Sequence, residues 1–383
     1  MVPARRGARV SHQIGNCLAA SSRSIAWLLV CSSLAACVVS AQAQDLESRA
    51  AAARDADDIS AALLLYRQAV QEKPGWLEGW WFLGLLAYES GQFADGRQAF
   101  TEFTRLDAKT PAGWTFLGLC EYETGEYDDA LDHLSRGLVS GARLDPDVER
   151  VARFHRALLL TRAGSFEEAR EGLKLFVERG IHDPVLIAGI GLNALGLTAL
   201  PQQVPAGQRD LVEMTGRAAY AWIAGDSEQT EAGFRSLLGA YPGAPGVHYL
   251  YATYLLLSHP EMMNGELQRE LEVNPGNARA RAAMALRLTL ARDPAAAVPF
   301  ARKAADDSPT LGLAQYAYGV ALTQTGALSD AIVHLQAAVR IDPGNLGYHT
   351  ALATAYSEAG RYEDAYRERQ ASIKLARESR GPG

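Results

Sequence analysis

The sequence predicts an all-α solenoid built from repeated helix–turn–helix units. Within each half-unit, apolar residues recur at spacings of three and four, which is the spacing of one face of a helix. Glycines, small residues and prolines recur with a longer period, and Pro275, Pro309 and Pro343 lie 34 residues apart. Because one such unit cannot bury its apolar face alone, neighbouring units are expected to stack into a continuous core.

Each position of the unit predicts a local structure. We number the units so that Trp80 and Trp114 fall at position 4 of the first helix. Glycine at position 15 predicts the end of that helix in the left-handed conformation, which glycine adopts at least cost. Proline at position 32 ends the second helix because it lacks an N–H and clashes with the preceding turn. The position-15 glycines are Gly91, Gly125, Gly164, Gly225, Gly326 and Gly360.

Small residues predict where the two helices of a unit approach each other closely. Position 20 of the second helix is small in most units, as at Ala130, Ala169 and Ala331. Position 8 of the first helix is small throughout: Gly84, Gly118, Ala157, Ala218, Ala252, Ala285, Gly319 and Ala353.

The pattern resembles the tetratricopeptide repeat, a 34-residue helix–turn–helix unit. Trp80-x-x-Leu83-Gly84 and Trp114-x-x-Leu117-Gly118 match its first helix, and Ala130 with Leu134 matches its second. The resemblance covers almost everything after residue 43, and it implies a right-handed superhelical solenoid of about nine to ten units. The units begin near residues 43, 77, 111, 150, 184, 211, 245, 278, 312 and 346.

Four segments follow from this pattern: residues 1–43, 44–183, 184–210 and 211–379. Residues 44–183 and 211–379 are an N-terminal and a C-terminal repeat block. Between them, residues 184–200 read as a first helix that is apolar all round and therefore buried, but a Pro-rich loop replaces its second helix. We expect this segment to join the blocks and to bend the superhelix.

Residues 1–43 have the features of a bacterial export signal. Arginines precede the apolar run from Ile25 to Ser40, and Ala41-Gln42-Ala43 forms a small-x-small cleavage site. The apolar run is shorter than the roughly 20 residues that span a bilayer. An exported protein, periplasmic or secreted, is therefore predicted. In the alternative, Leu34 to Cys37 resembles a lipobox, and Cys37 would carry a lipid anchor.

Composition excludes several classes of partner and site. The formal charge is −7; without the four arginines of residues 1–43, 33 basic residues stand against 44 acidic ones, a net charge of −11. Nucleic acid is not expected as a partner because phosphate binding needs clustered Lys and Arg. Membrane contact is expected only through a lipid on Cys37. Cys120 is the one cysteine after residue 43, so neither an internal disulfide nor a cysteine-based metal site is expected.

No enzyme signature is present, and we expect neither a catalytic site, a cofactor nor a metal. Six carboxylates crowd residues 121–132, but they lack the spacing of a calcium loop and are expected to face water. The glycines of Gly189-Ile190-Gly191 follow no strand, which argues against dinucleotide binding. The histidines form no metal-binding motif, and His133 and His334 share one repeat position, as residues at the edge of a core would.

The resemblance also implies where a partner binds. In tetratricopeptide repeats, positions 2, 5, 9 and 12 of the first helices line a concave groove. Position 5 here carries no Lys or Arg and position 9 no Asn, so the clamp that binds terminal carboxylates is not expected. Trp80 and Trp114 are assigned to the core. The predicted partner-binding residues are aromatic: Trp81, Tyr88, Tyr122, Phe154, Trp222, Tyr249 and Tyr316.

The sequence thus predicts a non-catalytic protein–protein interaction scaffold of the bacterial cell envelope. Its partner would be an extended peptide or a helix lying in the aromatic groove. Two alternatives stay open: a module that binds cell wall or exopolysaccharide, and an accessory subunit of an envelope enzyme or secretion complex.

Overall fold

The structure is a computed structural model that describes residues 45–139 and 141–378. Over these residues the chain is helical and contains no β-strand, which confirms the predicted all-α repeat solenoid. The predicted export signal and Cys37 lie outside the described residues. Within the described ranges, no helix is both long and apolar enough to cross a membrane.

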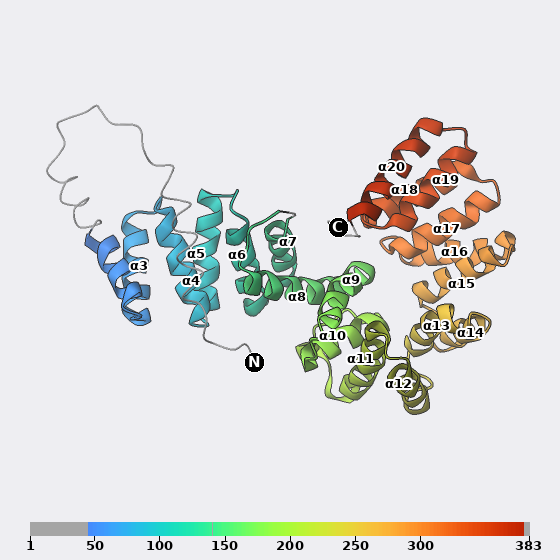
Figure 1. The fold of residues 1–383 in the computed structure, drawn as a ribbon, viewed down its shortest axis with the longest axis horizontal. Helices are drawn as coiled ribbons and strands as arrows, with labels where there is room; N and C mark the ends of the chain where they lie inside the picture. The colour runs from blue at the N-terminus through green and yellow to red at the C-terminus, as the bar shows by residue number, and fades with distance from the viewer. Residues whose placement is uncertain (1–44, 140, 379–383) are drawn as a thin grey trace. The chain divides into compact units, whose positions relative to one another are not determined.

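The chain divides into two compact units, Met1–Ala163 and Gly164–Gly383. In the first unit a helix over residues 45–55 is followed by pairs of packed helices, coloured blue to green in Figure 1. They are α3 (Ile59–Glu72), α4 (Leu77–Glu89), α5 (Phe93–Leu106), α6 (Pro111–Thr124), α7 (Tyr127–Gly137) and α8 (Pro146–Arg162).

In the second unit, pairs of packed helices repeat from α11 to α20 (Figure 1). The helices are α9 (Phe166–Glu178), α10 (Pro184–Leu195), α11 (Arg209–Ala224), α12 (Ser227–Ala240), α13 (Val247–Ser258), α14 (Met263–Val273), α15 (Ala278–Leu290), α16 (Pro294–Asp307), α17 (Gly312–Gln324), α18 (Leu328–Ile341), α19 (Leu346–Glu358) and α20 (Tyr362–Glu378).

The left-handed turn at position 15 is confirmed in every unit where glycine was predicted to form it. All six glycines have positive φ angles, for example +93° at Gly125 and +81° at Gly326. Two other units keep the same conformation without glycine, with φ of +58° at Asp57 and +62° at Arg292. The repeat geometry therefore imposes the left-handed turn even where the residue at position 15 is not glycine.

The small residues at position 8 allow the close helix contact that was predicted. A Cβ atom on Gly118 would lie 2.9 Å from the backbone nitrogen of Leu134, and one on Gly319 would lie 2.5 Å from the Leu335 side chain. Position 20 is equally crowded, and Ala130, Ala169 and Ala331 are fully buried.

The boundary between the two compact units falls between α8 and α9, which the sequence assigns to one repeat. The predicted connector 184–210 lies inside the second unit. The reason is the packing of α9, which contacts α10 and α11. Two short 3-10 helices, Pro201–Gln203 and Ala206–Gln208, follow α10 in place of a second α-helix.

Helix α10 is buried, as its apolar sequence predicts, and it packs closely against α11. The two helices meet through glycines. A Cβ atom on Gly191 would lie 2.0 Å from the Val212 carbonyl oxygen, and one on Gly216 would lie 2.0 Å from that of Ile187. Because any side chain at either site would overlap backbone atoms, the crossing depends on both glycines.

Candidate functional site: the first-helix face

In the first unit, the positions expected to line a groove are mostly packed inside the protein. Trp81 is only 2% exposed, and Thr115 and Leu119 at positions 5 and 9 of the next repeat are also buried. The Trp81 ring lies 5.1 Å from Phe103 and 5.7 Å from both Phe100 and Phe116, measured between ring centroids. Trp81 is therefore a core residue, and its assignment to the partner-binding surface is corrected.

The other aromatic residues of this unit reach across neighbouring repeats. Tyr88 is half-buried, with its ring centroid 5.4 Å from that of Phe116, and burial raises the pKa of its hydroxyl to about 12. Tyr122 is 9% exposed and lies 4.2 Å from the His155 ring. Burial lowers the pKa of His155 to about 4. Phe154, which is half-buried, packs edge-on against the same imidazole.

The second unit leaves more of these positions accessible. Trp222, Tyr249 and Tyr316 are all half-buried. Around the two tyrosines, most side chains at positions 5, 9 and 12 of α13, α15, α17 and α19 are half-buried or exposed, whereas Ala282, Thr289 and Thr323 are buried. We call this surface the open face; beside Tyr249 and Tyr316 it comprises Thr253, Leu256, Leu286, Val320, Thr350 and Thr354.

The difference between the units follows from side-chain size. In the first unit, aromatic rings at these positions span the distance between first helices, as Tyr88 does to Phe116. In the second unit the same positions hold mainly Thr, Leu and Val, which are too short to cover one another. The surface that results has no charged side chain at positions 5, 9 or 12.

The rings of the second unit make specific contacts at the edges of the open face. Tyr316 lies 5.1 Å from Tyr348, and Trp222 meets Tyr254 edge-on at 5.9 Å, both measured between centroids. The Tyr249 ring is covered by the Arg279 guanidinium, whose central carbon lies 4.8 Å from the ring centroid. Tyr249 is thus partly occupied by a contact within the chain.

Arg279 fixes one edge of the open face. It donates to the carbonyl oxygens of Asn193 and Ala194 in the last turn of α10, at 3.2 and 3.3 Å, and it also lies over the Phe166 ring. A cation at a helix C-terminus is stabilised by the unpaired carbonyls and the helix dipole. A cavity of about 290 Å³ lies beside it, with polar lining such as Asn277 and Thr310.

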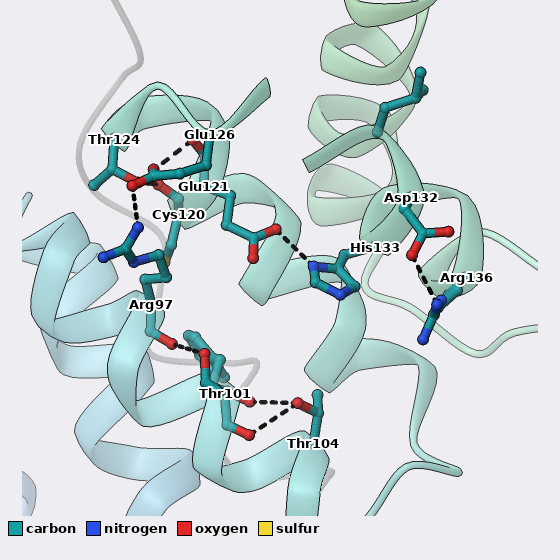
Figure 2. Close-up of polar contacts among 12 residues, drawn as sticks. Arg97, Thr101, Thr104, Cys120, Glu121, Thr124, Glu126, Asp132, His133 and Arg136 are labelled. Carbon is teal, nitrogen blue, oxygen red and sulfur yellow. Dashed lines mark hydrogen bonds and ion pairs between the residues drawn. The ribbon is translucent and has the colours of Figure 1, made fainter. Parts of the chain in front are cut away.

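Four of the six carboxylates of residues 121–132 pair with basic side chains of the same chain: Glu121, Glu126, Asp128 and Asp132. Figure 2 shows Arg97 and Thr124 converging on Glu126 and shows the side chain of Glu121 reaching His133. Glu121 is only 6% exposed, with its oxygen 2.7 Å from Nδ1 of His133, so the expectation that it faces water is wrong. The hairpin geometry brings together two residues that lie 12 apart in sequence.

Neighbouring groups in this region are paired or buried. Asp132 pairs with Arg136 one turn along the same helix. The Cys120 thiol is buried, and desolvation raises its pKa to about 12, which keeps it protonated and unreactive. Among the described residues, no group of three His, Cys, Asp or Glu side chains could hold a metal ion.

Comparison with known families decides the nature of these repeats. Two sequence models described as tetratricopeptide repeat match the chain, one over residues 83–149 and 292–345 and the other over residues 323–374. The matched segments of the chain are tetratricopeptide repeats. Proteins with these repeats bind protein partners and are typically non-catalytic. No protein of curated function matches the sequence significantly.

Solved structures with the same kind of fold are distant in sequence. MamA (residues 41 to the end) from Desulfovibrio magneticus RS-1 is 18% identical and has a TM-score of 0.37, covering 44% of this chain and 96% of its own. Cut9–Hcn1 of the APC/C is 13% identical with a TM-score of 0.39, covering 87% and 66%. Yeast Tom70 is 12% identical with a TM-score of 0.35, covering 88% and 85%.

One shared feature of these tetratricopeptide repeats was missed from the sequence. In six repeats the side chain at position 4 donates a hydrogen bond to the carbonyl oxygen six residues earlier, at the end of the preceding repeat. For Trp80 and Trp114 the nitrogen-to-oxygen distances are 2.8 and 2.9 Å. The six donor–acceptor pairs are Trp80–Pro74, Trp114–Ala108, His248–Pro242, Arg281–Pro275, Gln315–Pro309 and His349–Pro343.

Position 4 is therefore defined by its hydrogen-bond donor as well as by its bulk. Trp80, at 9% exposed, is in the core as predicted. Trp114 is only half-buried and is covered by the His133 ring at 5.1 Å and by the Arg136 guanidinium at 5.0 Å. The recurrence of a side chain with a nitrogen donor, at the same position of successive repeats, was the signal that could have revealed this contact.

Proposed function

We propose that this tetratricopeptide repeat protein is a non-catalytic binding scaffold of the bacterial cell envelope, and that the open face binds an extended peptide or a helix of a partner protein. The observation that carries the proposal is the contrast in burial between the units. The side chains at positions 5 and 9 are buried in α4 and α6 but half-buried or exposed in α13, α17 and α19.

The chemistry of the open face favours an uncharged, largely apolar segment. Its threonine hydroxyls are used within their own helices: Thr253 donates to the Tyr249 carbonyl and Thr354 to that of Thr350. These residues therefore offer mainly their methyl groups to a partner. Tyr249 and Tyr316 add rigid aromatic area, which contributes strongly to protein interfaces at low cost in side-chain entropy.

The assignment to the envelope rests on residues 1–43, whose sequence favours export, with a lipid on Cys37 as the alternative. Labelling with a fatty acid, comparing wild type with Cys37→Ser, distinguishes an anchored protein from a soluble exported one. Tyr88, Tyr122, Phe154 and Trp222 stay predicted contacts of secondary importance because each already packs against another ring.

The proposal is tested by capture from envelope extracts with a matched pair of substitutions. Val320→Arg places a charge on the open face, on α17, whereas Val333→Arg places the same charge on the adjacent helix α18, where Val333 is 58% exposed. We expect Val320→Arg to lose the captured proteins and Val333→Arg to retain them. Equal capture by both folded variants would refute the assignment.

A further inference from the structure

The last described helix, α20, carries an apolar stripe that no described helix covers. Tyr362 is 73% exposed, Tyr366 62% and Ile373 44%. The three residues are spaced by four and seven, so they lie on one face of the helix. Large apolar side chains gathered on one face in this way mark an interaction surface more often than single exposed ones do.

The repeat itself shows what such a stripe contacts. Ile332 and Val339 of α18 lie 34 residues before Tyr366 and Ile373, so they are the equivalent positions one repeat earlier. Ile332 is only 6% exposed and, with Val339, belongs to a core cluster that includes Leu352 and Tyr356 of the following helix, α19. The exposed apolar side chains of α20 thus occupy positions whose equivalents in α18 pack against the following helix.

The charges on α20 favour a particular partner. Residues 362–368 contain three acids and one arginine, whereas residues 369–377 contain three basic residues and no acid. Two copies of α20 that run antiparallel would bring the acidic half of each against the basic half of the other. A parallel pair would instead place like charges together.

We infer that two copies of the protein associate through α20 in an antiparallel, two-fold symmetric pair. With the axis between Arg369 and Gln370, Tyr366 of one copy meets Ile373 of the second copy, and Tyr362 meets Arg377 of the second copy. The first contact buries the apolar stripe, and the second forms a cation–π pair. Each contact occurs twice, as an isologous interface requires.

Stacking of α20 on the first described helix of another copy, which would build an open chain of molecules, is disfavoured by the residues at that end. From residue 45 onward, the first large apolar side chain that is exposed in the described structure is Leu64, beyond the helix at 45–55. That helix therefore offers no exposed large apolar side chain to match Tyr362, Tyr366 and Ile373.

The test is sedimentation of the full chain over a range of concentrations. We expect the wild type to shift from monomer to dimer, and Tyr366→Asp to weaken the dimer by more than about tenfold because the charge lies at the centre of the apolar contact. Val333→Asp is the matched control, an equally accessible apolar residue on α18, and it should dimerise like the wild type. Circular dichroism checks that both variants stay folded.

A charge exchange tests the antiparallel geometry separately from folding. Glu363 lies one residue from the position that faces Arg377 of the second copy, so Glu363→Arg alone and Arg377→Glu alone should each weaken the dimer. The double variant restores the opposed charges and should recover part of the affinity, but not the cation–π contact with Tyr362. A wild type that stays monomeric, species larger than a dimer, or a double variant weaker than both single ones would overturn the inference. Because none of the substituted residues of α20 belongs to the open face, these outcomes are independent of the capture experiment.

Discussion

The left-handed residue at position 15 gives a stability prediction that can be worked from the backbone alone. Arg292 has a φ of +62° and an exposed side chain, whereas the next repeat has Gly326 at the same position with a φ of +81°. An added Cβ on Gly326 would meet no atom within 4 Å. Any effect of exchanging the two residue types therefore comes from backbone conformation and not from crowding.

The left-handed conformation costs a non-glycine residue roughly 1–2 kcal/mol. Glycine loses about 0.5–1 kcal/mol more conformational entropy on folding than other residues do. Arg292→Gly should therefore stabilise the protein by about 0.5–1 kcal/mol, the difference between these terms. Gly326→Arg should destabilise it by a similar amount. Asp57→Gly should increase the stability of the protein by less than Arg292→Gly does, because aspartate adopts positive φ more readily than arginine.

Urea unfolding followed by helical circular dichroism measures these differences, and hydrogen exchange in α15 and α16 shows whether the change is local. Repeat arrays do not always unfold in one step, so the local measurement checks the global one. A destabilised Arg292→Gly, or a Gly326→Arg variant as stable as the wild type, would show that the turn is not under conformational strain.

Three other predictions follow from contacts in the two units. Trp81→Ala should cost about 3–5 kcal/mol in urea unfolding, while Trp81→Phe should cost much less because the indole N–H has no hydrogen-bond partner among the described residues. Burial lowers the pKa of His155 to about 4 in the folded protein, below its unfolded value near 6.5. The neutral imidazole therefore contributes to stability above pH 6.5, and this contribution is lost as pH falls through 4. Urea midpoints of wild type should therefore fall more steeply between pH 7 and pH 4.5 than those of His155→Phe. Arg279→Ala should release the end of α10, seen as faster hydrogen exchange in that helix, whereas an unchanged rate would show that the contact is dispensable.

Features that depend on one repeat could be predicted from the sequence. The glycines at position 15 and the small residues at position 8 are dictated by the local chain path and by the contact between two successive helices. Both were correct because no distant residue alters them. Trp81 was misjudged because positions 4 and 5 are neighbours on the helix, and its burial depends on rings contributed by α5 and α6.

The division of the chain could not be predicted for a related reason. Both α8 and α9 keep the repeat pattern, including Gly164 between them, so the sequence gives no sign that they separate. The packing of α9 on α10 and α11 decides it. These two helices are themselves joined by the close approach at Gly191 and Gly216, which lie on different helices. Glu121 and His133 were likewise missed as a pair because the hairpin, not their spacing, brings them together.

The hydrogen bond from position 4 has a consequence for how such repeats evolve. In six repeats that position holds a nitrogen donor that reaches one carbonyl group, and indole, imidazole, amide and guanidinium groups all make this contact. Substitutions among these four residue types can accumulate while the helices keep their registration. A repeat can thus lose the tryptophan that makes it recognisable and still serve its neighbours as an equivalent structural unit.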